Sequence, residues 1–167
     1  MEKVLKIGPV ITVTLGEFWR IRLQILVQKD VDSLINSTKI PVRLSCIMPN
    51  GFPCVLSLWF ICVDGKLCCA TQESAKIVKY LKNNSSCAFE IAADTPPYRG
   101  IRGYGVAKIR SDIGVEILNK LIDRYLENKE SKLAKFLRKN AENEVAIEIT
   151  PKRIFSYDYS KRMRDSK

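Results

Sequence analysis

A junction suited to binding a phosphate is the first chemistry that the sequence suggests, in the stretch ATQESAKIVKYLKNN at residues 70–84. An apolar run ends at Thr71, and a helical pattern begins near Ser74. The first N–H groups of a helix are unpaired and lie at the positive end of its dipole, which favours an anion. Ser74 could add a hydroxyl hydrogen bond and Lys76 a charge. In the alternative interpretation, Thr71 or Ser74 only caps the helix and Lys76 is solvated.

A second candidate anion site is the segment PPYRGIRGYG at residues 96–105. Its glycine spacing, G-x-x-G-x-G, is not the dinucleotide-binding fingerprint. Arg99 and Arg102, in a loop fixed by proline and glycine, could hold a carboxylate or a phosphate in a bidentate way. The alternative is a solvated turn between two strands.

The elements that must position these residues follow from periodicity and turn chemistry. Asn50-Gly51 and Asp64-Gly65 are typical of tight hairpin turns, so they predict successive antiparallel strands around them. Strands are expected at 42–48, 54–63, 66–71, 87–94, 104–111 and 144–160, and helical patterns cover 29–38, 74–84, 112–126 and 131–140. About six core strands with two to four helices predict a mainly β, α+β fold: a small antiparallel barrel with helices at its side.

The expected strand at 54–63 is apolar on both faces, CVLSLWFICV. One face must fill the barrel interior, and the other requires a partner surface because neither can be left facing water. Trp59 in this strand is either a core residue or a wall of a cofactor site.

The composition narrows the chemistry further. A net charge of +10, from 28 Lys and Arg against 18 Asp and Glu, attracts phosphate-bearing cofactors, nucleic acid or acidic lipid. Histidine is absent, which excludes histidine triads, imidazole proton shuttles and zinc sites of the usual kind. No metal site is therefore predicted.

Six cysteines lie in apolar, strand-like contexts without a C-x-x-C pair. They indicate buried free thiols in a reducing cytoplasm, and a disulfide or metal site is the alternative. No apolar run reaches the roughly 18 residues needed to span a bilayer, so we expect a cytoplasmic protein without a membrane partner.

Three regions are expected along the chain: an N-terminal extension at 1–28 of unclear role, one domain at 29–160, and a basic C-terminal tail at 161–167. The extension contains two short β-like pieces.

Four motifs occur in order within residues 57–109: S-x-W-F, the hairpin D-G, T-x-x-S-x-K, and P-P-Y-R-G-x-R-G-x-G. In this order they resemble the pyridoxamine 5′-phosphate oxidase-like, flavin-binding split-barrel family, and the likeness extends more loosely over residues 29–159. The resemblance implies a six-stranded antiparallel split β-barrel of the FMN-binding type. It also implies a homodimer with two flavin sites at the interface, and an oxidoreductase whose hydride chemistry belongs to FMN or, alternatively, a deazaflavin.

The resemblance also implies which residues bind the cofactor. Thr71, Ser74 and Lys76 would hold the phosphate, and Ser57, Leu58 and Trp59 would border the flavin ring. Arg99 and Arg102 would complete the site near the interface. No catalytic residue is assigned.

The sequence departs from true pyridoxamine phosphate oxidases in ways that concern the substrate. It cannot supply their Arg-x-His pair, residues 55–62 contain no base to match their phosphate-gripping arginine, and Ser156-Tyr157-Asp158 stands where relatives often have Ser-Trp-Asp. The comparison therefore favours relatives that use FMN or a deazaflavin for other reductions, with an unknown small-molecule substrate. Storage or sensing of the flavin without turnover is equally compatible with the sequence.

A nucleic-acid-binding small β-barrel is the alternative function, because basic charge and aromatic residues are its signature. Its distinguishing sign would be exposed aromatic residues interleaved with Lys or Arg on one face of the sheet. Phe52, Trp59, Phe60 and Phe89 lie in apolar strands instead, so nucleic acid is not the expected partner.

Overall fold

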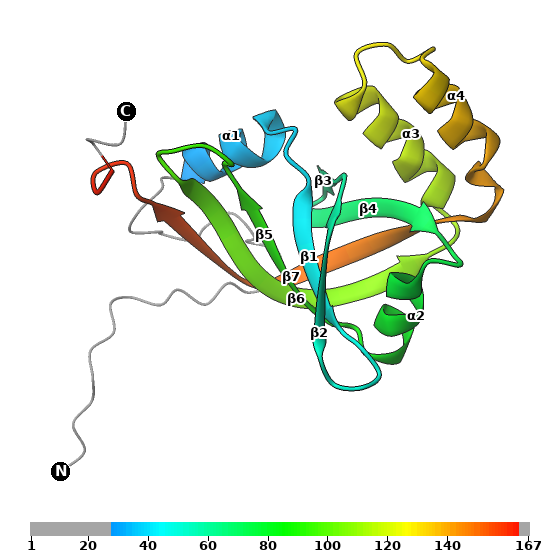
Figure 1. The fold of residues 1–167 in the computed structure, drawn as a ribbon, viewed down its shortest axis with the longest axis horizontal. Helices are drawn as coiled ribbons and strands as arrows, with labels where there is room; N and C mark the ends of the chain where they lie inside the picture. The colour runs from blue at the N-terminus through cyan, green and yellow to red at the C-terminus, as the bar shows by residue number, and fades with distance from the viewer. Residues whose placement is uncertain (1–27, 164–167) are drawn as a thin grey trace.

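A computed structural model of the chain describes residues 28–163, with side-chain burial described from residue 33 (Figure 1). The predicted extension at 1–28, apart from its last residue, and the end of the predicted basic tail lie outside the described residues. Within the described part, no helix is long and apolar enough to cross a membrane.

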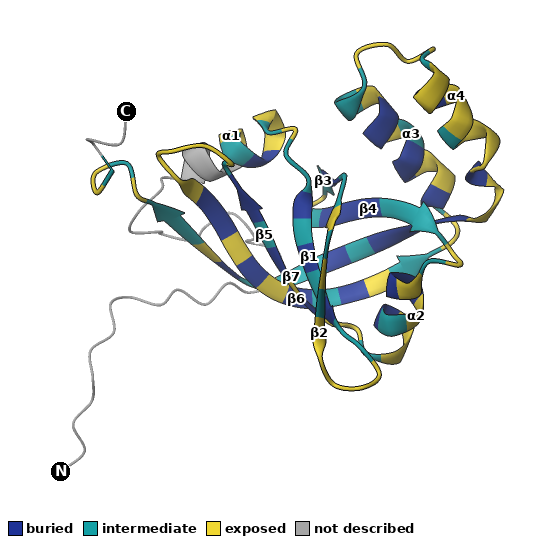
Figure 2. Cartoon of the chain, viewed as in Figure 1, coloured by how far each residue is buried: buried dark blue, intermediate teal, exposed yellow. Residues whose placement is uncertain are grey.

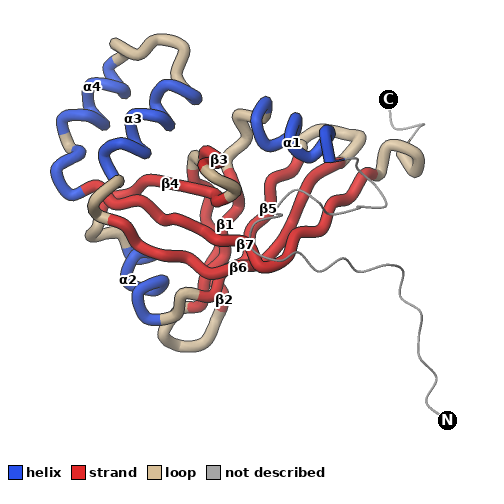
Figure 3. Tube along the Cα trace, turned by 180° about the vertical axis from the view of Figure 1, so that it is seen from behind, coloured by secondary structure: helices blue, strands red, loops and turns tan. Residues whose placement is uncertain are grey.

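A single antiparallel sheet forms the centre of the described structure, with strand order β2-β1-β5-β6-β7-β4-β3. The strands are β1 (Val42–Ile47), β2 (Pro53–Leu58), β3 (Ile61–Val63), β4 (Lys66–Gln72), β5 (Ser86–Ala92), β6 (Arg99–Arg110) and β7 (Glu144–Asp158). The sheet is strongly curved, and its edge strands β2 and β3 are consecutive in the chain but are not paired with each other (Figure 3). This arrangement is a split barrel, and it confirms the predicted α+β fold class.

The structure has seven strands where six were expected, because the predicted strand at 54–63 is broken. Extending the β3–β4 register, in which Ile61 pairs with Cys68, would place Leu58 opposite Thr71. The ladder ends at Ile61 instead, and β2 pairs with β1 at the other edge of the sheet. Phe60 at the break is fully buried, so this segment bends to place its ring in the core.

Strand β6 also differs from the prediction. It begins at Arg99, so most of the predicted Pro- and Gly-rich loop is strand. Gly103 and Gly105 allow this, because a Cβ at Gly103 would collide with the carbonyl oxygen of Arg153, and one at Gly105 with that of Thr150. The β6–β7 register shifts between Tyr104 and Gly105, and β7 continues through Pro151 as predicted.

The helices α1 (Gln28–Ser37), α2 (Lys76–Asn83), α3 (Gly114–Tyr125) and α4 (Lys132–Lys139) lie close to their predicted positions. The predicted hairpin turns are present, with positive φ angles at Gly51, Asp64 and Gly65.

The main core lies on the inner face of the sheet. Alternate residues of the strands point inward, including Leu44, Phe89 and Ile147, and α1 and α2 contribute Ile35, Ile77, Val78 and Leu81. The even-numbered residues of β2, Cys54, Leu56 and Leu58, pack against this core, so one of the two predicted apolar faces does fill the barrel. The six cysteines form no disulfide within the described residues, and four of them are buried, as predicted, while Cys54 and Cys62 are half-buried.

A second cluster lies on the outer face, where α3 packs on β3, β4 and β7. It joins Ile117 and Leu121 of α3 to Ile61, Cys68 and Ala146 of the strands. A third cluster connects α3 to α4 through Leu118, Ile122 and Ala134. Helix α3 therefore covers one end of the outer face and α4 packs on α3, while the end of α1 lies beside the C-terminal end of α3 (Figures 1 and 3).

Candidate functional site

The rest of the outer face, over β2, β1, β5, β6 and the second half of β7, carries no helix among the described residues, and we call it the open face (Figure 1). It contains a groove of about 400 Å³. The groove is lined by Arg43, Ser45, Val55, Ala88, Phe89, Glu90, Arg102, Gly103, Tyr104 and Phe155. Because side chains alternate along a strand, the same strands that line the core also present this second, outward set.

Three apolar or aromatic side chains are left exposed on the open face: Val55 at 64%, Tyr104 at 46% and Phe155 at 39%. Pro53, Val55 and Ser57 are the exposed, odd-numbered positions of β2. Within residues 28–163 no element covers this part of the second apolar side of the predicted strand, whereas Trp59 and Ile61 on the same side pack under α3. A surface of this kind is typical of a binding or association site.

Charged and phenolic groups form a connected network at the groove. Arg43 forms salt bridges with Asp94 and, at 3.7 Å, with Glu90. The hydroxyl of Tyr157 donates a hydrogen bond of 2.9 Å to Glu90. Burial, followed by the hydrogen bond to Glu90, raises the pKa of Tyr157 to about 12, so the phenol stays protonated at neutral pH.

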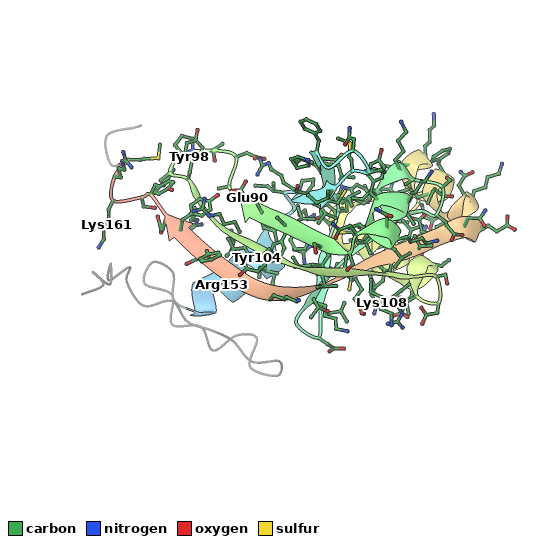
Figure 4. All side chains as sticks on the ribbon, turned by 90° about the horizontal axis from the view of Figure 1, so that it is seen from below. Glu90, Tyr98, Tyr104, Lys108, Arg153 and Lys161 are labelled. Carbon is green, nitrogen blue, oxygen red and sulfur yellow. The ribbon has the colours of Figure 1, made fainter. Side chains whose placement is uncertain are left out.

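Arg102 is the cation that the network leaves available. Its guanidinium lies 5.8 Å from the centre of the Tyr157 ring, and among residues 28–163 it forms no salt bridge. Arg153 similarly lies 5.1 Å from the centre of the Phe155 ring. Tyr104 and Arg153 are register partners on β6 and β7, and they lie close together in Figure 4. The open face thus interleaves aromatic rings with guanidinium groups.

The predicted phosphate junction lies at a different place, where β4 leads into α2. Thr71 is half-buried in β4, while Ser74 and Lys76 are exposed. The N-cap of α2 is Ala75, and no side chain caps the helix. Neither Thr71 nor Ser74 is a cap, so the alternative interpretation of these residues as helix caps is wrong. The N–H groups of Ala75 and Val78 already donate to the carbonyls of Gln72 and Ala75, so those of Lys76 and Ile77 are left for an anion, beside the Ser74 hydroxyl and the Lys76 ammonium.

Polar contacts that the sequence did not indicate hold this junction in place. The Gln72 amide donates hydrogen bonds to the Glu144 carboxylate and, at 2.7 Å, to the carbonyl of Asn140. Glu144 is the buried charged residue of the described chain, and burial raises its pKa. The N–H of Glu73 donates to the carbonyl of Asn143 at 2.8 Å. Cross-strand pairing of β4 with β7 creates these contacts, so no local motif could have revealed them.

The predicted ring-binding residues lie where β2 ends: Ser57 and Leu58 are its last two residues, and Trp59 follows directly. Ser57 faces outward and Leu58 packs against the inner core. The Trp59 ring stacks on Tyr125 of α3, with centroids 4.9 Å apart and planes 10° apart. Trp59 is thus also part of the second core cluster, whichever role it has toward a cofactor.

The C-terminal end of α3 supports this bend. The Tyr125 hydroxyl accepts a hydrogen bond of 3.2 Å from the N–H of Phe60. Arg124 donates to the carbonyls of Ile35 and Thr38 at the end of α1, at 2.6 and 2.8 Å. The break between β2 and β3 is therefore fixed by α3, an element far away in the sequence.

The eight predicted residues do not form one cluster within a single chain. Arg102 lines the groove, whereas Arg99 lies at the start of β6, where Asp158 is its register partner. The segment is a strand and not the predicted loop, and the two arginines are three positions apart on it. Their side chains therefore leave the backbone on opposite faces of the sheet. The groove residues that sequence analysis missed, such as Tyr104 and Phe155, could have been found from the alternation of β6 and β7 once these were known to be strands.

Comparison with known proteins identifies the fold. No protein-family model and no curated protein matches the sequence. A conserved hypothetical protein from Mycobacterium tuberculosis matches the structure with a TM-score of 0.71 and 20% identity, over 83% of this chain and 88% of that one.

An F420 reductase matches with a TM-score of 0.58 and 21% identity, over 73% of this chain and 94% of that one. A protein described as a pyridoxamine 5′-phosphate oxidase candidate, from Listeria innocua, matches with a TM-score of 0.60 and 15% identity, over 77% and 95%. With the curved antiparallel sheet and its unpaired edges β2 and β3, these matches show that the chain has the split-barrel fold of pyridoxamine 5′-phosphate oxidase-like proteins.

Proposed function

We propose that this protein binds FMN or a deazaflavin at the interface of a homodimer formed through the open face, and that it is an oxidoreductase. The observation that carries the proposal is the groove on the open face, with the available cation Arg102 and the exposed rings of Tyr104 and Phe155. A fold shared with an F420 reductase and a pyridoxamine phosphate oxidase candidate supports a flavin-type cofactor.

The residues present are chemically suited to such a cofactor. The uncapped start of α2, with Ser74 and Lys76 exposed, suits a phosphate group. Aromatic and aliphatic side chains on the open face suit a planar ring. The bound cofactor would supply the hydride chemistry, which requires no histidine from the protein. A second copy of the chain would bury Val55 and Phe155 and bring a second set of these residues to the interface.

The direct test is titration of the purified full-length protein with FMN and with F420, followed by absorbance and fluorescence. We expect binding of one of the two, with a cofactor to chain ratio of one. Lys76→Ala should weaken binding about tenfold, because it removes a charge-assisted contact to the phosphate. Lys79→Ala, on an exposed position of the same helix, is the matched control. Absence of binding to both cofactors, or an equal loss in both variants, would contradict the proposal.

Nucleic-acid binding remains a second candidate, and one observation favours it. Exposed aromatics interleaved with arginines, the sign expected of such a surface, are present on the open face as Tyr104, Phe155, Arg102 and Arg153. Rings of this kind can stack on bases while guanidinium groups contact phosphates. Glu90 and Asp94 on the same side oppose a polyanion. Fluorescence anisotropy with a labelled single-stranded oligonucleotide, measured over a range of salt concentrations, separates the two functions.

A further inference from the structure

Helix α4 is a short basic helix at the periphery of the molecule, with the sequence KLAKFLRK. It packs on α3 through one fully buried residue, Ala134, and through the half-buried Leu137. Its first turn is capped by Ser131, whose hydroxyl accepts a hydrogen bond of 3.2 Å from the N–H of Ala134. The remaining positions of α4 are exposed (Figure 2). The helix is therefore well formed but contributes few side chains to the hydrophobic core.

Two large apolar side chains of α4 are left in solvent: Leu133 at 46% and Phe136 at 61% exposure. Three residues apart, they lie side by side on the helix surface. The equally short helix α2 provides a contrast, because its apolar residues Ile77, Val78 and Leu81 are all buried. The exposed apolar pair is thus specific to α4 and is not a general property of short helices in this protein.

Lysines surround the exposed ring. Lys132 precedes Phe136 by four positions and Lys139 follows it by three, so both neighbour it on the helix surface. Neither forms a salt bridge within the part of the chain that the structure describes. Lys135 and Arg138 lie 3.7 and 3.8 Å from the carboxylate of Glu130. The helix itself contains four cations and no acid.

We propose that α4 binds reversibly to the surface of an anionic lipid bilayer, a property beyond the proposed cofactor site. Leu133 and Phe136 would enter the boundary between headgroups and acyl chains, while Lys132 and Lys139 contact lipid phosphates. A bilayer surface offers both an apolar layer and negative charge at the depth of one helix face. The basic charge of α4 complements anionic headgroups, and the exposed ring of Phe136 lies between Lys132 and Lys139 along the helix. We therefore infer an anionic bilayer as the partner and not a neutral one.

A lipid surface accounts for the pattern better than nucleic acid does. A phosphate backbone would engage the lysines but would offer no apolar phase to Leu133 or to the edge of Phe136. The sequence-based expectation of no membrane partner rested on the length needed to span a bilayer, and an interfacial helix does not need that length. Helix α4 packs on α3, which covers the other half of the outer face, so binding there leaves the open face accessible (Figure 1).

The test is co-sedimentation of the full-length protein with two kinds of vesicle at physiological ionic strength: pure phosphatidylcholine, and equal parts phosphatidylcholine and phosphatidylglycerol. We expect partition onto the anionic vesicles only. The double variant K132E/K139E should lower that partition at least 25-fold, because each lysine near an anionic surface contributes about fivefold. Phe136→Ser should lower it about fivefold through lost apolar burial.

The matched control is K79E/K108E, which makes the same charge change at exposed positions of α2 and β6. Charges farther from the bilayer than about 8 Å are screened, so this variant should bind within about twofold of the wild type. Thermal unfolding of all variants checks that they are folded. No partition onto anionic vesicles, or an equal loss in the control, would overturn the proposal. So would a Phe136→Ser variant that binds fully while an oligonucleotide competes with the vesicles, since that outcome indicates a polyanion site.

Discussion

The outer face of the sheet has one half that α3 covers and one half that is open. Strand alternation places side chains on both halves, but the side chains differ in size and character. Under α3, the outward residues Cys68 and Ala146 are buried and small, so the helix packs close to the strands. On the open face the outward residues are larger and mixed in character, such as Val55, Arg102 and Tyr104. The comparison teaches that outward apolar residues are core where an element covers them and candidate binding residues where none does.

The two halves also differ in how polar groups are satisfied. Beneath α3, Tyr125 and Trp59 stack on each other, and the Tyr125 hydroxyl accepts the N–H of Phe60. At the groove, Arg43, Glu90 and Tyr157 form a network that remains in contact with solvent. A sealed core tolerates few unpaired groups, whereas an open groove can present cations such as Arg102 to a ligand.

The largest effect is expected in the covered half. Leu121→Ala removes a side chain that is 1% exposed and contacts the outer-face strands, so it should lower the free energy of unfolding by about 3 kcal/mol. Val115→Ala on the same helix, where the side chain is 44% exposed, is the control and should change it by less than about 0.5 kcal/mol. Urea denaturation measures both, and equal losses would mean that α3 does not form a core with the sheet.

The next effect concerns self-association through the open face. Phe155→Asp places a charge within the proposed interface, and we expect the dimer to dissociate at least tenfold more readily while the monomer stays folded. Phe136→Asp alters a more exposed phenylalanine, at 61% against 39%, which lies on α4 away from this face, and it serves as the control. Light scattering after size-exclusion chromatography reports the mass of each. A wild-type monomer at all concentrations would remove the basis for the homodimer.

A smaller effect is expected at the boundary between the halves. Tyr125→Phe leaves the stacked ring but removes the hydroxyl that accepts the Phe60 N–H, so stability should fall by about 1 kcal/mol. Tyr98→Phe, at an exposed tyrosine, should have no measurable effect. If the two variants behave alike in urea denaturation, the hydrogen bond at the break between β2 and β3 does not contribute to stability.

The smallest effect is a pH dependence at Glu144. Burial raises the pKa of this carboxyl above its ordinary value of 4.5. Its contribution to stability is therefore fully present below that value and is lost as the pH rises through the raised pKa. Glu144→Gln keeps an acceptor for Gln72 and removes the charge, so its stability should depend less on pH just above 4.5. Glu142→Gln, at an exposed neighbour, should leave the wild-type pH profile unchanged, and an identical profile for both would contradict the assignment.

Much of the fold was predictable because its signals are local. Asn50-Gly51 and Asp64-Gly65 marked two hairpins correctly, and the 3.6-residue pattern of Ile117, Leu118 and Leu121 marked α3. The family resemblance predicted the split barrel. The break at Trp59 and Phe60 was not predictable, since the continuous apolar run favoured one strand, and the bend is favoured by tertiary contacts: burial of the Phe60 ring in the core and the contacts with Tyr125 of α3.

The candidate site was predictable only in part. Ser74 and Lys76 lie at an uncapped helix start, as their types suggested, although no ligand contact tests their role. The groove residues Tyr104 and Phe155 come from strands that pair across fifty positions of sequence. Composition and spacing do not report such pairing, so alternation could place these residues on a strand face but could not show that the two faces meet in one groove.

The sequence by itself determined the kinds of element, their turns, the basic charge and the absence of imidazole chemistry, because each depends on residue type and short-range spacing. The tertiary structure decided the strand order, which half of the outer face α3 covers, and hence which apolar side chains remain exposed. Burial depends on what packs over a residue, and the covering element here comes from a distant part of the chain. That dependence separates Leu121 in the core from Phe155 in the groove.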